Sequence, residues 1–310
     1  MARTALLLDD FFMRHRTEYG HPECPERLAA IRKALDPLED LVVLRSRKAD
    51  LEEIALCHDP RYVENVLKLL ESGETELAGG DVSVCAESGK VALHAAGGVI
   101  ETVDAVLIGH MQNAFCAVRP PGHHARPAAA MGFCIFNNIA IAARHAQRQH
   151  GVERVAIVDW DVHHGNGTEE IFYSDGSVLY FSTHQWPWYP GTGHASETGE
   201  GKGAGLIINC PLPAGSGRAE ILRVFCDRLL PALEKYRPQL LLISAGFDSR
   251  VGDPLGQFRL TDQDFADLTR MLLDFAAGPC GGRVVSVLEG GYNLAGLGEA
   301  VKFHVSQLVG

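Results

Sequence analysis

Two aspartates and a histidine occupy alternate positions in the segment RVAIVDWDVHHGNG. They are Asp159, Asp161 and His163, and they follow an apolar run at residues 155–158. Side chains two residues apart point to the same side of an extended chain, so the segment gathers two carboxylates and an imidazole along one edge. No lysine or arginine lies between residues 155 and 167. Because unpaired buried carboxylates are costly, the cluster requires a cation, a salt bridge or an exposed position.

A catalytic zinc ion would satisfy these groups. Such an ion takes carboxylate and imidazole ligands, with three from the protein and one open position. Asp161 and His163 would be two ligands, and LLLISAGFDSR places a third, Asp248, after an apolar run. The two carboxylates would balance one dication per chain, which remains a Lewis acid. The alternative is a capped strand-to-helix turn with Asp161 or Asn166 as N-cap, and the triplet alone does not decide between the two.

Two further motifs carry groups that could take part in amide hydrolysis. VRPPGHHARP presents His123 and His124 on a stiff loop. One imidazole could take a proton from a metal-bound water and return it to a leaving amine. In SVLEGGYNL, two glycines allow a sharp turn, from which Tyr292 could donate to an oxyanion. By itself, a Gly-Gly-Tyr sequence favours an ordinary turn.

Apolar runs typical of strands alternate with helical patterns along the chain. Strands are expected at residues 5–10, 42–46, 113–118, 154–161, 178–183, 205–210, 239–246 and 283–290, and helices at 24–35, 61–70, 84–107, 137–150, 218–236 and 262–277. Nearly continuous apolar strands indicate a parallel sheet with helices on both faces. Such sheets bind ligands beyond the carboxyl ends of their strands, where the long loops 119–133 and 184–203 are expected. No linker or repeat interrupts the pattern, which predicts one domain over residues 1–310.

Composition excludes several classes of function. The 310 residues, 46% of them hydrophobic, can bury a large core. A net charge of -11 argues against a nucleic-acid-binding surface and weakly favours cationic partners. The apolar runs are too short for a signal peptide or a membrane span. Eight scattered cysteines without Cys-x-x-Cys spacing predict reduced thiols and a cytoplasmic protein. The oligomeric state is not indicated.

Seven motifs, in order along nearly the whole chain, resemble the histone deacetylase superfamily, which includes acetylpolyamine amidohydrolases. They are HPECPERL (21–28), RPPGHHA (119–125), MGFCIFNN (131–138), DWDVHHGNGT (159–168), YPGTG (189–193), GFDSRVGDPLG (246–256) and LEGGYNL (288–294). The resemblance implies the arginase-deacetylase fold, an α/β fold with a central, mostly parallel eight-stranded sheet and helices on both faces. It also implies a zinc-dependent deacylase that hydrolyses the amide of an acylated amine, such as acetyl-lysine, to a carboxylate and a free amine.

The resemblance gives each candidate residue a role. Zinc would be bound by Asp161, His163 and Asp248; His124 would be general base and acid, His123 its electrostatic support, Tyr292 the group that polarises the acyl carbonyl, and Asp159 the partner of His123. Asn166 stands where many members carry an aspartate, a departure shared with the class II branch. Since a neutral partner stabilises imidazolium less, we expect His124 to be mostly neutral at pH 7.

The resemblance further implies a narrow substrate tube. Phe133 and Tyr189 would flank it, Gly132 would hydrogen-bond the acyl-lysine stem, Asp81 would hold the substrate backbone at the rim, and Leu255 would stand where some polyamine-selective relatives carry a glutamate. The leucine favours other substrates. A potassium ion is implied near Asp159, Ser182 and Thr183. Arg27 would lie near an internal acetate exit, or be a solvated arginine at a helix start.

Three other functions stay open. They are an acetylpolyamine or other small-molecule amidohydrolase, an arginase-like amidinohydrolase with two manganese ions, and a non-enzymatic protein that binds acyl-amines. Several histidines on expected helices or turns are predicted to have no matching carboxylate nearby and to be surface or core residues: His58, His94, His110, His145 and His304. His184 lies closer to the expected site, and we also predict a structural role for it.

Overall fold

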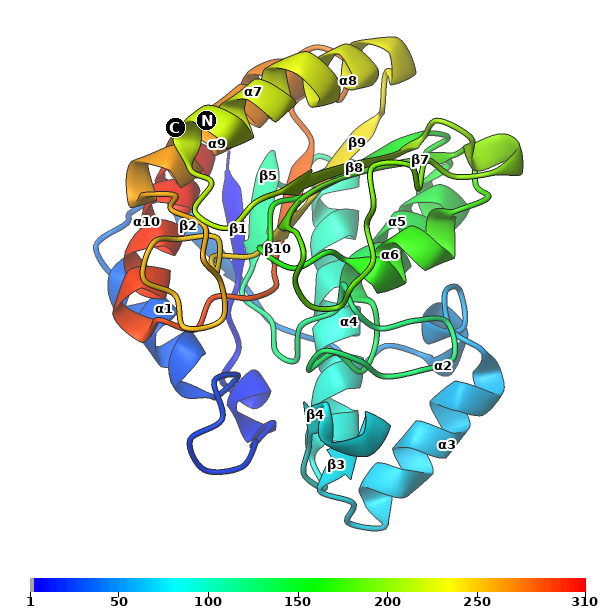
Figure 1. Ribbon diagram of the computed structural model, residues 1–310. Helices are drawn as coiled ribbons and strands as arrows, with labels where there is room; N and C mark the ends of the chain where they lie inside the picture. The colour runs from blue at the N-terminus through cyan, green and yellow to red at the C-terminus, as the bar shows by residue number, and fades with distance from the viewer. Residues whose placement is uncertain (1–2) are drawn as a thin grey trace.

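A sheet of eight parallel strands forms the centre of the molecule. Figure 1 shows this computed structural model, which describes residues 3–310. The strands lie in the order β2-β1-β5-β10-β9-β6-β7-β8. Their bounds are β1 Thr4–Leu7, β2 Leu41–Leu44, β5 Asn113–Cys116, β6 Val155–Asp159, β7 Val178–Gln185, β8 Ile207–Leu212, β9 Leu240–Ala245 and β10 Val284–Leu288. All eight predicted strands are confirmed, and every pairing within this sheet is parallel.

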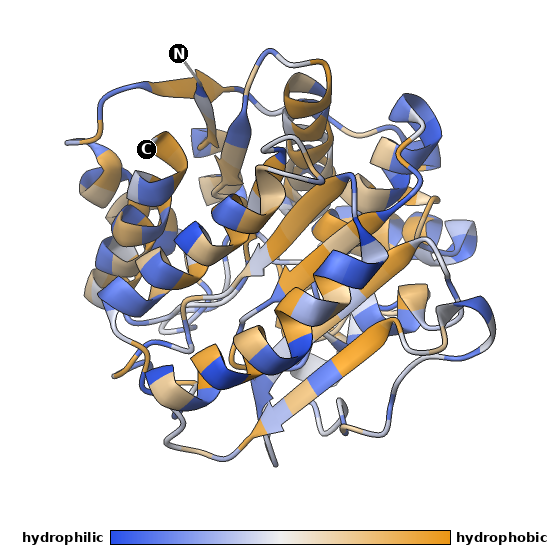
Figure 2. Cartoon of the chain, turned by 90° about the horizontal axis from the view of Figure 1, so that it is seen from above, coloured by the Kyte–Doolittle hydropathy of each residue, from blue (hydrophilic) through white to orange (hydrophobic). Residues whose placement is uncertain are grey.

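The central strands are apolar because helices exclude water from both of their faces. Every residue of β6, β9 and β10 is buried. Figure 2 shows the same strands as largely hydrophobic ribbons, while many helices carry one hydrophilic and one hydrophobic side. A strand buried on both faces has no reason to alternate apolar with polar residues, so its sequence is a continuous apolar run.

Helices pack in two groups against this sheet (Figure 1). Helices α1, α9 and α10 pack together in one group, and α4 packs with α5 in the other. The helix bounds are α1 Glu26–Leu35, α2 Leu51–Ile54, α3 Pro60–Glu71, α4 Ser88–Leu107, α5 Asn138–His150, α6 Asn166–Phe172, α7 Arg218–Val224, α8 Leu230–Tyr236, α9 Asp262–Ala276 and α10 Leu294–Val309. None of the helices among residues 3–310 is both long and apolar enough to cross a membrane.

Some elements differ from the sequence expectation. We expected one regular helix over residues 218–236. The whole segment is helical, but a π-helical turn at Phe225–Leu229 lies between the α-helices α7 and α8. Helices α2 and α10 were not predicted, because α2 has only four residues and α10 begins with the glycine-containing sequence LAGLG. Helix α6 is the short helix that the capped-turn alternative expected after Asp161 or Asn166. A small antiparallel pair, β3 (Glu76–Leu77) and β4 (Val82–Ser83), was also missed. Two-residue strands are too short to produce a periodic pattern.

Candidate active site

The carboxyl ends of four neighbouring strands bring the predicted chemical groups together. Strands β5, β10, β9 and β6 are consecutive in the sheet, although they are not consecutive in the sequence. His123 and His124 follow β5, Tyr292 follows β10, Asp248 follows β9, and Asp161 and His163 follow β6. Parallel strands end at the same edge of a sheet, so loops that are distant in the sequence converge there.

The three predicted metal ligands lie together in the interior. One donor atom from each of Asp161, His163 and Asp248 lies within 4.8 Å of the other two, and all three residues are buried. His163 Nδ1 is 3.0 Å from Asp161 Oδ1 and 3.2 Å from Asp248 Oδ2. The backbone N–H of Gly290 donates to Asp161 Oδ2 at 2.8 Å. A Cβ at Gly290 would lie 2.0 Å from Asp248 Oδ2, so only glycine allows this approach.

The charges of this cluster fit a dication. Burial, followed by the negative charge of Asp161, raises the pKa of Asp248 to about 7. Burial opposes ionisation of Asp161 too, but His123 and His163 lower the pKa of that carboxyl below its usual value. Two adjacent buried carboxylates resist carrying two negative charges, and a cation between them removes the conflict. The donor set of one imidazole and two carboxylates therefore suits a single zinc ion.

The alternative of a capped turn is wrong. Helix α6 begins at Asn166 with Gly165 as its N-cap residue, and no side chain caps its first turn. The Asn166 side chain instead accepts a hydrogen bond from His124 Nδ1–H at 2.8 Å. Its amide oxygen is therefore used to orient a histidine.

His124 is held as a neutral imidazole. The Nδ1–H bond to Asn166 selects the tautomer with a free lone pair on Nε2. Burial, and then the positive charges of His123 and His163, hold the pKa of His124 well below its usual value of 6.5. Such a ring is neutral at pH 7 and can accept a proton, as a general base must.

His123 carries the opposite charge state. Its Nδ1–H donates to Asp159 Oδ2 at 3.0 Å, and the Tyr180 hydroxyl donates to the same oxygen at 3.1 Å. Burial favours the neutral ring, but the charges of Asp159, Asp161 and Glu289 raise the pKa of His123 to about 10. The ring centroids of His123 and His124 are 4.0 Å apart. The histidine pair thus combines one imidazolium with one neutral imidazole.

Glu289 supports this loop and was not among the predicted site residues. Its Oε2 accepts from the backbone N–H of Gly122 at 2.7 Å and of His123 at 3.1 Å. The side chain is fully buried, and burial raises its pKa to about 7. The signal was present in LEGGYNL, because a glutamate directly after an apolar strand needs buried hydrogen-bond donors.

A cavity of about 250 Å³ opens above the histidines. It is lined by Asp81, His124, Gly132, Phe133, His163, Trp188, Tyr189, Pro254, Leu255 and Tyr292. All five predicted substrate-binding residues belong to this lining. The lining also includes the predicted metal ligand His163, the candidate base His124 and the candidate oxyanion donor Tyr292. The tertiary structure therefore places the expected groups around one space.

Tyr292 is positioned by Arg27. The Arg27 guanidinium carbon lies 5.0 Å from the centre of the Tyr292 ring, and the guanidinium donates to the carbonyl oxygens of Gly291 and Glu289 at 2.7 Å and 2.6 Å. Burial raises the pKa of Tyr292 well above 10, so its hydroxyl keeps a proton to donate. Arg27 is fully buried, and the alternative of a solvated arginine is therefore wrong.

Asp81 connects two sides of the cavity mouth. Its Oδ2 accepts from the Gly132 backbone N–H at 2.6 Å and from the Tyr189 hydroxyl at 2.8 Å. Gly132 has a φ of +55°, and a Cβ there would lie 2.3 Å from His124 Cδ2. Both the left-handed backbone and the contact with His124 require glycine at this position. The Tyr189 ring meets the His124 ring edge-on, with centroids 5.2 Å apart.

The outer wall of the cavity is largely apolar. Phe133 packs edge-on against Tyr292, with ring centroids 5.9 Å apart. Trp188 Nε1–H donates to the Leu255 carbonyl at 2.9 Å, which joins the two loops that carry these residues. Trp188 was missed in the sequence, although it directly precedes Tyr189 in WPWYPGTG. Apolar walls of this kind suit an aliphatic chain.

Comparison with known proteins identifies the family. A model of the histone deacetylase domain matches residues 21–308. The chain belongs to the histone deacetylase family. Within this family, it is 40% identical to a probable deacetylase of Archaeoglobus fulgidus, over 94% of this chain and 82% of that protein. It is 42% identical to the histone deacetylase-like amidohydrolase of Pseudomonas aeruginosa, over 89% of this chain and 73% of that protein.

A longer relative and a solved structure also match the chain. The chain is 42% identical to the human polyamine deacetylase HDAC10 over 99% of its own length. It spans only 48% of the length of that protein. The crystal structure of the HDA15 HD domain matches with a TM-score of 0.94 at 36% identity, covering 99% of this chain and 88% of that one. This match and the eight-stranded parallel sheet show the arginase-deacetylase fold. Family membership supports a hydrolase activity.

The potassium ion implied by resemblance to the histone deacetylases has no support in the side-chain geometry. Ser182 pairs with Asp159 across strands β6 and β7, but its hydroxyl is hydrogen-bonded to His184 Nδ1 at 2.9 Å. Thr183, one residue further, points to the other face of β7, so the two hydroxyls do not converge. Thr183 Oγ1 is buried without a hydrogen-bond partner among residues 3–310. The potassium ion stays a prediction.

Proposed function

We propose that this chain is a zinc-dependent deacylase that hydrolyses the amide of an acylated amine to a carboxylate and a free amine. One observation carries the proposal: His163 of the metal-ligand cluster, the neutral His124 and the phenol of Tyr292 face the same cavity. The names of the relatives, probable deacetylase and histone deacetylase-like amidohydrolase, support the same reaction class.

Each group at the cavity would have a separate role in amide hydrolysis. A zinc ion held by Asp161, His163 and Asp248 would supply a Lewis acid that polarises the acyl carbonyl and lowers the pKa of a water molecule. His124 would accept a proton from the attacking water at Nε2 and then donate it to the departing nitrogen. Its low pKa makes protonated His124 a strong acid for the second step. The Tyr292 hydroxyl would stabilise the oxyanion of the tetrahedral intermediate.

We propose acetyl-lysine or a related acyl-amine as the substrate. The apolar lining by Phe133, Tyr189 and Leu255 supports an aliphatic stem, and Gly132 would bind that stem by a hydrogen bond. A second candidate, an acetylpolyamine, is favoured by the 42% identity with the human polyamine deacetylase. Leu255 weighs against it, because a leucine at the mouth offers no negative charge to a distant ammonium group.

The metal content and chain organisation form part of the same proposal. Among residues 3–310, the other group of three metal-binding side chains consists of Asp104, His145 and His150 on α4 and α5. These residues do not line the active-site cavity, so one metal ion rather than a manganese pair is supported there.

We further propose that residues 1–310 form one deacetylase domain, since one buried core includes side chains from β1 through α10. Scattered cysteines, all free in the structure, support a cytoplasmic location.

Hydrolysis of an acetyl-lysine peptide tests the proposal directly. For the zinc-loaded protein, H124A should lower kcat/KM by about 10²- to 10⁴-fold, the usual contribution of a general acid–base group. D248N should lose both zinc and activity. H194A is the matched control, because His194 is exposed and does not line the cavity. Chelation should abolish turnover, and added zinc should restore it.

The outcomes separate the candidate functions. Full activity in H124A or D248N would contradict the deacylase mechanism. Comparison of kcat/KM for acetyl-lysine peptides, acetylspermidine and longer acyl-lysines would rank the substrates. Tight binding of these amides by wild-type protein without any turnover would instead indicate a protein that only binds acyl-amines, and ureohydrolase activity with two metal ions would indicate an amidinohydrolase.

A further inference from the structure

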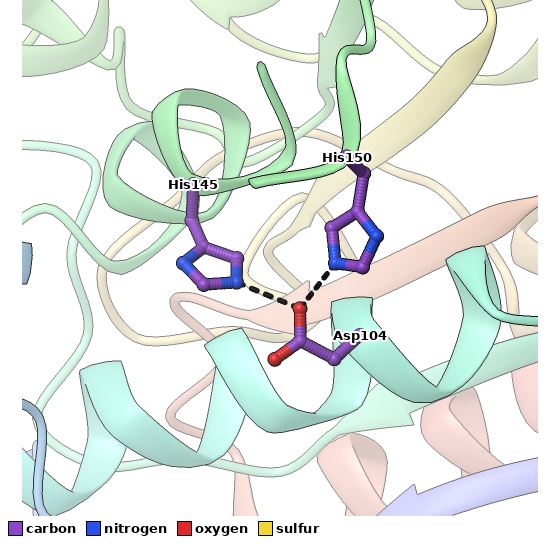
Figure 3. Close-up of side chains that lie close together, drawn as sticks. All are labelled: Asp104, His145 and His150. Atoms are coloured by element: carbon purple, nitrogen blue, oxygen red, sulfur yellow. Dashed lines mark hydrogen bonds and ion pairs between the residues drawn. The ribbon is translucent and has the colours of Figure 1, made fainter. Parts of the chain in front are cut away.

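A second group of metal-binding side chains lies toward the carboxyl-terminal ends of two packed helices. Asp104 comes from α4, and His145 and His150 come from α5 (Figure 3). We call these three residues the α4–α5 cluster. The Nε2 atoms of His145 and His150 lie 2.7 Å and 2.6 Å from the same oxygen, Asp104 Oδ1. The prediction that His145 has no carboxylate near it is therefore wrong.

The α4–α5 cluster lies toward the edge of the sheet opposite to the active site. Helix α4 ends at Leu107, shortly before β5 begins at Asn113, and α5 ends at His150, shortly before β6 begins at Val155. These helix ends are therefore near the amino ends of their following strands. The active site lies beyond the carboxyl ends of the same strands. A ligand of the cluster is thus separate from the substrate and from the active-site metal.

The donor atoms of the α4–α5 cluster are those that zinc prefers. One carboxylate oxygen and two imidazole nitrogens lie within 4.8 Å of one another. Two histidines and one carboxylate, completed by water, are an established zinc ligand set. With bond lengths of about 2.0–2.1 Å, tetrahedral ligands lie roughly 3.3 Å apart, so each histidine nitrogen needs to move away from Asp104 Oδ1 by roughly 0.6 Å. His150 is the last residue of α5, and its side chain is 21% exposed, which permits this shift.

A further carboxylate faces the other ring nitrogen of His145. Glu53 Oε1 lies 4.0 Å from His145 Nδ1, while Asp104 faces Nε2 of the same ring. Arg47 holds the Glu53 carboxylate through two hydrogen bonds of 2.8 Å and 2.7 Å. A carboxylate facing Nδ1 favours the tautomer with its proton there and its lone pair on Nε2. In zinc sites an outer carboxylate commonly accepts a hydrogen bond from the second nitrogen of a histidine ligand, and Glu53 lies on the side of the ring from which it could do so after a small movement.

The surface beside the cluster favours the approach of cations. A cavity next to His145 is lined by three acidic residues, Asp50, Glu52 and Glu53, as well as by Arg148. A lining with an excess of negative charge raises the local concentration of cations. The Asp104 side chain is itself 31% exposed, so an ion can reach it from solvent.

We propose that the α4–α5 cluster binds one zinc ion through a carboxylate oxygen of Asp104 and Nε2 of His145 and His150. The ion links α4 to α5, which pack against each other beside the sheet. It stabilises the folded chain because the unfolded chain does not hold the three ligands together. It takes no part in amide hydrolysis.

Zinc stoichiometry tests the proposal. The purified protein and its variants are equilibrated with buffered free zinc, and bound metal is measured by mass spectrometry. H150A removes one ligand at a partly exposed position, and D104N removes the negative charge without changing the size of the side chain. H110A is the control, because His110 is exposed and outside the cluster. We expect two zinc ions in wild type and H110A, and one in H150A and D104N.

The active-site variant D248N separates this proposal from the proposed function. One zinc ion in wild type, H150A and D104N, with none in D248N, would overturn the second site and leave the deacylase proposal intact. One ion in wild type and D248N, with none in H150A and D104N, would support the α4–α5 cluster and overturn the active-site zinc.

Thermal unfolding gives a second measurement. Zinc added at 100 times its Kd to protein already loaded at the active site should raise Tm by roughly 4 °C. The increase should vanish in D104N and H150A and persist in H110A. An equal increase in D104N and wild type would overturn the proposal.

Discussion

Replacement of Asn166 by aspartate tests how the neutral amide controls the candidate base. Asn166 Oδ1 accepts from His124 Nδ1–H at 2.8 Å. The neighbouring histidine provides an internal comparison, because His123 donates to a carboxylate, Asp159, at 3.0 Å. Against the effect of burial, Asp159 together with Asp161 and Glu289 raises the pKa of His123 to about 10. An aspartate at position 166 would place the same kind of charge beside His124.

The size of the effect follows from this geometry. A carboxylate in contact with an imidazole raises the imidazole pKa by about 1–3 units. Asn166 is partly exposed, so water would screen its new charge, and we expect the lower part of that range. A shift of about 1–2 units corresponds to roughly 1.4–2.7 kcal/mol. The base is active only when neutral. A higher pKa therefore moves the acidic limb of kcat/KM upward by about 1–2 pH units.

The assay is the pH dependence of kcat/KM for an acetyl-lysine peptide with zinc-loaded wild type, N166D and N166A. N166A removes the hydrogen-bond acceptor without adding charge, so its acidic limb should not move upward. Zinc content measured at each pH excludes loss of metal as the cause. If the acidic limb of N166D coincides with that of wild type, His124 is not the titrating base, or Asn166 does not control it.

Three further predictions concern the oxyanion donor, the cavity mouth and a buried histidine. Y292F should lower kcat/KM by about 10²- to 10³-fold at unchanged zinc content, since one oxyanion donor is lost; a loss below tenfold would argue against this role. L255E should raise the kcat/KM ratio of acetylspermidine to acetyl-lysine peptide by about fivefold through an ion pair at a partly exposed site, and an unchanged ratio would contradict this. Burial holds the pKa of His304 at about 3, so between this pH and 6.5 the unfolded chain binds one more proton. Wild-type stability should therefore fall with decreasing pH by about 1.4 kcal/mol per unit from this residue. Urea unfolding at pH 7 and pH 5 should show that the free energy of unfolding falls less in H304Q than in wild type. An equal fall in the two proteins would contradict the role of His304.

Local sequence was sufficient for the eight strands of the central sheet and for part of the candidate site. A strand buried on both faces must be apolar throughout, so the strands were visible as continuous runs. The alternation of Asp159, Asp161 and His163 directly after β6 is also a local feature. The structure adds that Asp161 and His163 lie with Asp248, while Asp159 turns to His123. The roles of these residues remain predictions.

Residues that act through tertiary contacts escaped the sequence analysis. Glu289 holds two backbone N–H groups of the histidine loop, which begins more than 160 residues earlier in the chain. Trp188 joins the loop of Tyr189 to that of Leu255. Asp104 meets His145 and His150 only because α4 packs against α5. No local period or spacing encodes such contacts.

By itself, the sequence determined which groups are available and which strand each group follows, because side-chain chemistry and burial patterns are local properties. Only the tertiary structure decided which strands are neighbours. The order β5-β10-β9-β6 places the loops of His124, Tyr292, Asp248 and Asp161 at one edge of the sheet. That order results from packing apolar strands and helices into one core, a property of the whole chain and not of any single segment.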